Sequence, residues 1–170
     1  MRRLRTLFVA AAVCIVLLGG ANANAEDEAN CYTLASLQGS YSIIGHYGDH
    51  LAIALVRAHL DGKGNFTSTF VVNEPDPAST TGGRKLVTGS QTGTYTINCN
   101  GTGVITRVVA SSVGNGTVVS DFVITRAVRS NSNERVLIVT ELADAQRTPS
   151  FIVPGGVFLT RTYTRLPDGP

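Results

Sequence analysis

The segment from His46 to His50 places two imidazoles and the carboxylate of Asp49 within five residues. Such side chains bind transition metals or form the acid–base part of a catalytic centre. If Gly48 and Asp49 form a two-residue hairpin turn, His50 pairs with Tyr47. His46 and His50 then point to opposite faces of the sheet, because side chains alternate along a strand. We therefore expect a polar turn here and no metal site.

Arginines within apolar strands form a second group of candidate residues. Arg57 and Arg126 each follow apolar residues at alternate positions. An arginine inside a barrel needs a carboxylate or a ligand anion as its partner. The bulkier side chains lie on the face of His46 and Arg57, so we expect this face to be the interior, although both arginines could instead point into solvent. The predicted ligand-binding residues are His46, Arg57, Phe122 and Arg126.

A third group consists of the carboxylates of Glu74 and Asp76, which lie in the sequence Asn-Glu-Pro-Asp-Pro. Paired carboxylates can act as general acid and base, but only where burial shifts their pKa values. The two prolines indicate a stiff loop. We expect both carboxylates to be solvated there.

The N-terminus has the pattern of a secretory signal peptide covering residues 1–25. Three arginines precede an apolar run from Leu7 to Leu18, and small residues follow it. The apolar run is shorter than the roughly 20 residues that a spanning helix requires. We expect cleavage after Ala25, or alternatively after Ala23. The mature protein would be secreted or periplasmic and would not span a membrane.

Removal of the signal peptide changes both the charge and the cysteine content. The chain has 14 Lys and Arg against 12 Asp and Glu, and the signal removes three arginines and no acid, so the mature net charge is about −1. This balance gives no indication of nucleic acid or an anionic membrane as a partner. The signal also removes Cys14. In an oxidising compartment we expect Cys31 and Cys99 to form a disulfide, the alternative being two buried free thiols.

The remaining residues, 26–170, read as a single all-β domain. Short β-branched runs alternate with turn sequences such as Asp-Gly-Lys-Gly-Asn, and no helical periodicity of useful length is present. Sequential hairpins predict an antiparallel up-and-down barrel of about eight strands, with a β-sandwich as the alternative. The expected strands cover residues 39–47, 51–60, 66–72, 89–98, 103–112, 117–128, 135–142 and 157–166.

An up-and-down barrel places alternate connections at opposite ends. One end would contain the short turns, including the turn with Cys99, together with the segment of Cys31. The disulfide would close this end. The two longest connections, from Asn73 and from Ala143, would share the other end with the turn of His46–His50. We expect this second end to be the mouth of the barrel.

Three segments resemble a group of small exported bacterial proteins of largely uncharacterised function. These are Leu37–Tyr41, with the pattern Leu-x-Gly-x-Tyr, the hairpin sequence of Asp61–Asn65, and Gly93–Thr102. The resemblance implies a small barrel of the allene-oxide-cyclase-like or calycin-like kind. It carries over framework and turn residues and no catalytic ones.

The function we expect from the sequence is non-enzymatic binding of a small apolar or weakly acidic molecule in the barrel lumen. No motif specifies a reaction or a cofactor. An isomerase or cyclase that acts in the cavity is one alternative. Strands that are apolar on both faces also suit a surface or assembly protein, including a homo-oligomer.

Overall fold

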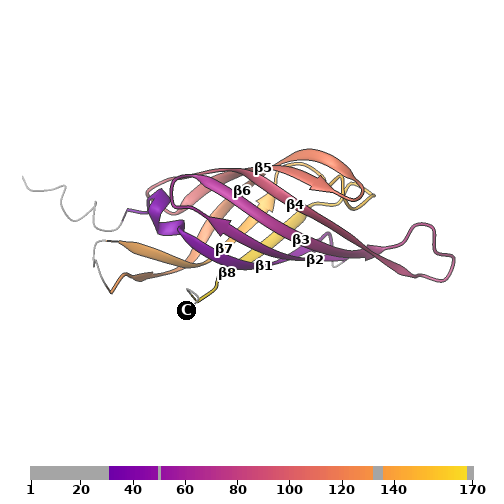
Figure 1. Cartoon of the computed structure of the whole chain (residues 1–170), viewed down its shortest axis with the longest axis horizontal. Coiled ribbons are helices and arrows are strands. Elements are labelled where there is room, and N and C mark those ends of the chain that lie inside the picture. Colours follow the sequence, from indigo (N-terminus) through magenta and orange to yellow (C-terminus); the bar gives the residue numbers. More distant parts are fainter. Residues whose placement is uncertain (1–30, 50, 132–135, 168–170) are drawn as a thin grey trace, which may run out of the picture.

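The computed structural model describes residues 31–49, 51–131 and 136–167, which form a closed antiparallel barrel with the strands in chain order (Figure 1). The prediction of an all-β, eight-stranded up-and-down barrel is confirmed. The predicted signal peptide lies outside the described residues. Within them, no helix is long and apolar enough to cross a membrane. The elements are the 3-10 helix η1 (Leu34–Leu37) and strands β1 (Gly39–Tyr47), β2 (Ala52–Leu60), β3 (Asn65–Pro75), β4 (Arg84–Ile97), β5 (Thr102–Ser111), β6 (Gly114–Arg129), β7 (Leu137–Gln146) and β8 (Leu159–Arg165).

Two connections at the mouth differ from their predicted form. Tyr47 pairs with Ala52, so the first turn has four residues between the strands instead of two. The amide of Leu51 closes it by donating to the carbonyl of Tyr47 over 3.0 Å. The long connection after Asn73 is shorter than predicted, because β3 and β4 continue as a paired ribbon to Pro75 and Arg84. This hairpin projects beyond the barrel at the end opposite η1 (Figure 1).

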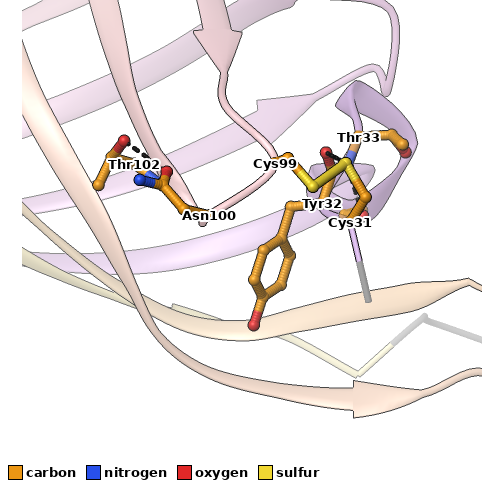
Figure 2. The surroundings of a disulfide bond; sticks show 7 residues. Cys31, Tyr32, Thr33, Cys99, Asn100 and Thr102 are labelled. Carbon is orange, nitrogen blue, oxygen red and sulfur yellow. Dashed lines mark hydrogen bonds between the residues drawn. A yellow bond between two sulfur atoms is a disulfide. The ribbon is translucent and has the colours of Figure 1, made fainter. Parts of the chain in front are cut away.

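The disulfide between Cys31 and Cys99 closes the other end, as predicted, and joins cysteines 68 positions apart whose Cα atoms are 4.4 Å from each other. The amide of Tyr32 also donates to the carbonyl of Cys99 over 3.1 Å. Figure 2 shows the bond joining the turn of Cys99 and Asn100 to the segment before η1. We call this the closed end.

Side chains fill the barrel in two apolar clusters. The cluster at the closed end contains large side chains, among them Tyr41, Phe66 and Phe122. The cluster at the mouth is lined mainly by small side chains from the strands, and two residues of the β7–β8 connection, Ile152 and Val153, pack into it. This mouth cluster consists of Tyr47, Ala52, Ala54, Phe70, Val72, Val87, Val109, Val118, Ile152, Val153 and Leu159.

The expected interior face was the wrong one. Tyr41, Ile43 and Tyr47 of β1 are buried, whereas Ile44 is half exposed on the outside. In β2 three of the five interior positions are alanines, because the large rings of neighbouring strands already fill the space. Side-chain bulk therefore indicated the wrong face for strands that are apolar on both sides.

Candidate functional site

A layer of polar side chains crosses the barrel interior between the two apolar clusters. It consists of Arg107, Ser120, Asp144, Arg161 and Tyr163, all of which are buried. Asp144 accepts hydrogen bonds from Nη2 of Arg107 at 2.6 Å and from Nε of Arg161 at 2.8 Å. The Ser120 hydroxyl accepts from Nη1 of Arg107 at 3.0 Å and from Nη2 of Arg161 at 2.7 Å. We call these five residues the polar layer.

Two glycines lie beside these long side chains on neighbouring strands. Gly93 lies in register between Phe66 and Arg107, and the guanidinium carbon of Arg107 lies 5.2 Å from the centre of the Phe66 ring. A Cβ at Gly93 would lie 1.9 Å from a backbone oxygen. Gly45 faces Arg161 across β1 and β8, and a Cβ there would lie 3.1 Å from Cγ of Arg161. Gly93 therefore allows the backbones of β4 and β5 to approach each other beside Arg107, and Gly45 gives Arg161 space to cross the interior.

The polar layer carries one excess positive charge, because two guanidinium groups share one carboxylate. Arg107 is 1 % exposed and Arg161 is 4 % exposed, so bulk water does not screen this charge. The hydroxyl of Tyr163 donates to Asp144, and burial raises the pKa of this tyrosine. Tyr163 therefore stays neutral and adds no negative charge to the layer.

The β7–β8 connection, residues 147–158, covers the mouth, and we call it the lid. Its ends are held by hydrogen bonds from the amide of Arg147 to the carbonyl of Val119 and from the amide of Gly48 to the carbonyl of Phe158. In its middle, the Ser150 hydroxyl accepts from the amides of Ile152 at 3.0 Å and Val153 at 3.3 Å. These bonds turn the two apolar side chains down into the mouth cluster.

The prediction that the Glu74 carboxylate is solvated is wrong, because its side chain is buried. It lies on β3 directly opposite Lys85, whose Nζ is 3.1 Å from Oε1 of Glu74. Asp76 is partly buried and accepts a hydrogen bond from the amide of Ala78. The extra length of the β3–β4 ribbon is what turns Glu74 inward. Of the four buried charged residues described, Glu74 is the only one outside the polar layer.

The four predicted ligand-binding residues are not brought together. Phe122 is buried in the interior, but Arg57 and Arg126 are exposed and His46 lies on the outward face of β1. Arg126 points outward because a β-bulge between residues 124 and 126 reverses the alternation of β6. It forms an exposed ion pair with Glu141.

Sequence reasoning missed Arg107, Asp144 and Arg161, although the alternation of their strands marks them. Each lies two positions from buried apolar residues on its own strand, as Arg161 does between Leu159 and Tyr163. The alternation of side chains also suggests an interior position for Arg57 and Arg126. It fails for Arg57 because the wrong face of the strand is taken as interior, and for Arg126 because of the bulge. The polar layer could be predicted from charged residues that occupy interior positions on three different strands.

Comparisons with protein-family models, curated proteins and solved structures found no match to this chain. The structure shows the small β-barrel that the resemblance implies and nothing finer. The calycin-like assignment stays a prediction. The features that bear on function are therefore the polar layer, the mouth cluster and the lid.

Proposed function

We propose that the protein is an exported barrel that binds a small apolar molecule with a weakly acidic group in the mouth half of its interior. The observation that carries this proposal is the excess positive charge of the polar layer. An ionised carboxylate that reached Arg107 or Arg161 would balance the charge and accept charge-assisted hydrogen bonds. The disulfide supports the exported location, because such bonds persist in oxidising compartments.

The mouth cluster suits the apolar part of such a molecule. Alanine and valine side chains of the strands leave much of the space to Ile152 and Val153. A ligand chain would take the place of these two side chains when the lid lifts. Gly155 and Gly156 lie in the lid with φ values of 101° and 71°, a conformation that glycine adopts without strain. The lid can therefore change its backbone path at these two residues.

Isothermal titration calorimetry with octanoate and 1-octanol tests the proposal at neutral pH. Both probes have the same apolar chain, so their difference isolates the acidic group. We expect octanoate to bind at one site at least about tenfold more tightly, because hydrogen bonds to charged groups contribute about 1.5–3 kcal/mol. The proposal would be contradicted if neither probe bound saturably, or if both bound with equal affinity.

A matched pair of variants locates the site. Arg161→Met leaves Arg107 paired with Asp144, so the layer becomes neutral and should remain folded. We expect this variant to lose the preference for octanoate over octanol. Arg126→Met removes an arginine whose side chain is 69 % exposed on the outside, and it should bind both probes as the wild type does. Equal behaviour of the two variants would place the binding site elsewhere.

An isomerase or cyclase that acts on the same class of molecule is a second candidate. It is favoured by the pair of Tyr163 and Asp144, which are hydrogen-bonded to each other inside the barrel. The raised pKa of Tyr163 makes its hydroxyl a donor and not a base. Incubation of 3-octenoate with the protein, followed by NMR, tests this candidate. An unmoved double bond would argue for binding alone.

The exported location has its own test. Expression of the full chain in a bacterial host and N-terminal sequencing of the exported product should give Glu26 as the first residue. Recovery of a chain that still begins at Met1 would contradict export through a cleaved signal.

A further inference from the structure

The outer face of β1–β4 carries a contiguous set of exposed apolar side chains. Ile44, Ile53, Leu55 and Leu86 are 49 %, 40 %, 55 % and 66 % exposed. Ile44 lies opposite Leu55, which in turn lies opposite Val71. We call these five residues the apolar face. All of them except Ile44 line a shallow groove of about 560 Å³, which Asn73 and Arg84 complete. The grouping is larger than the scattered single apolar residues of an ordinary surface.

The charged side chains at the outward strand positions around the apolar face are positive, and carboxylates occur only in the turns that join these strands, at Asp49, Asp61 and Asp76. Among the described outward positions of β1–β4 there is no carboxylate, whereas Arg57 and Arg84 are both outward and exposed. Arg57 is opposite Thr69 and Arg84 is opposite Pro75 on β3. Six residues of strand span roughly 20 Å, so the two guanidinium groups bracket the apolar face.

Arg84 is held in place at the edge of the groove. Its guanidinium group donates to the carbonyls of Asn73 at 2.9 Å and Leu51 at 3.2 Å. Outward carboxylates occur elsewhere on the barrel, where Asp121 of β6 pairs with Arg147 and Glu141 of β7 pairs with Arg126. On the strands themselves, the apolar face is thus accompanied by basic groups alone.

We infer that the apolar face docks on a lipid bilayer with anionic headgroups. Apolar side chains enter the boundary between headgroups and acyl chains, and arginines bind the phosphates. A second copy of this chain is the less suitable occupant, because face-to-face contact would bring Arg57 and Arg84 against outward strand positions that carry no carboxylate. This inference is independent of the proposed ligand, and it adds a second, external surface to the protein.

Co-sedimentation with vesicles tests the inference. One set contains phosphatidylcholine and phosphatidylglycerol in equal amounts, and the other contains phosphatidylcholine alone. We expect the protein to bind the anionic vesicles more strongly and to lose this binding as salt is added. Absence of binding to both sets, or equal binding to both, would overturn the inference.

Outward variants identify the docking residues without touching the core. Leu55→Ser combined with Leu86→Ser should lower the partition onto anionic vesicles by at least about tenfold, because less apolar surface is buried. Arg57→Gln should lower it about fivefold, as expected for one basic residue near an anionic surface. Val123→Ser, at a comparably exposed apolar position on β6, is the control and should bind as the wild type does.

Circular dichroism confirms that each variant is folded before its binding is compared. Equal loss of binding in the control and in the double variant would overturn the inference. So would a dimer, detected by light scattering in the absence of lipid, that Leu86→Ser dissociates, because that result would assign the face to a second copy.

Discussion

Asp144→Asn is the substitution that the interior tolerates least. The carboxylate of Asp144 is the only one in contact with Arg107 and Arg161 in the polar layer, and its side chain is fully buried. Asparagine has nearly the same volume, so the change removes charge without creating a cavity. Two guanidinium groups would then remain buried together with no counter-charge. Removing one partner of a buried ion pair costs about 3–5 kcal/mol, a large part of the stability of a typical domain.

Equilibrium unfolding in urea, followed by circular dichroism, measures this cost. Asp121→Asn is the matched control, because Asp121 also binds an arginine, Arg147 at 2.7 Å, but on the exposed surface. We expect no measurable loss of stability in the control. Arg161→Met should cost less than Asp144→Asn, because it leaves the balanced pair of Arg107 and Asp144. If Arg161→Met proved the more destabilising of the two, the polar layer would not hold an excess positive charge.

Three further predictions concern the lid, the turns and the disulfide. Ile152→Ala should lower the free energy of unfolding by roughly 2 kcal/mol and yet strengthen octanoate binding, because the ligand no longer displaces a bulky side chain; weaker binding in calorimetry would contradict the role of the lid. Asp61 accepts bonds from the amides of Lys63 and Asn65 and from the Asn65 side chain, which lower its pKa to about 2. Its stabilising effect is therefore complete above about pH 4 and lost as the pH falls toward 2; a carboxyl NMR titration that gave an ordinary aspartate value would refute this. Cys99→Ser should cost roughly 4 kcal/mol for a loop of this length, measured by thermal unfolding against the oxidised wild type, and an unchanged midpoint would contradict the role of the bond.

The fold could be predicted from the sequence because turns and strands have local signals. Asp-Gly-Lys-Gly-Asn and the segment around Cys99 mark hairpins by residue type, and the disulfide follows from cysteine count and the predicted export. The length of the β3–β4 ribbon could not be predicted in this way. Its pairing from Asn73 to Arg84 depends on cross-strand contacts, such as the Arg84 side chain bonded to Asn73, that no local pattern specifies.

The candidate site could be predicted only in kind. The sequence correctly indicates an interior arginine with an acidic partner. It points to the wrong arginines, Arg57 and Arg126. Strand β2 is apolar on both faces, so its sequence does not say which face is buried. The bulge in β6 changes the direction of Arg126, and a single extra residue of this kind leaves no mark in the alternation. The pairing of Arg107 with Asp144, 37 positions apart, depends on how the barrel closes.

The most direct test of the proposed function is the pKa of the ligand itself. Octanoate labelled with ¹³C at its carboxyl carbon can be titrated by NMR while bound to the protein. The account predicts a carboxyl pKa well below its value in free solution, because Arg107 and Arg161 stabilise the ionised form. It also predicts that this lowering disappears in Arg161→Met. A bound carboxyl that titrates at or above its free value in the wild type would contradict binding at the polar layer.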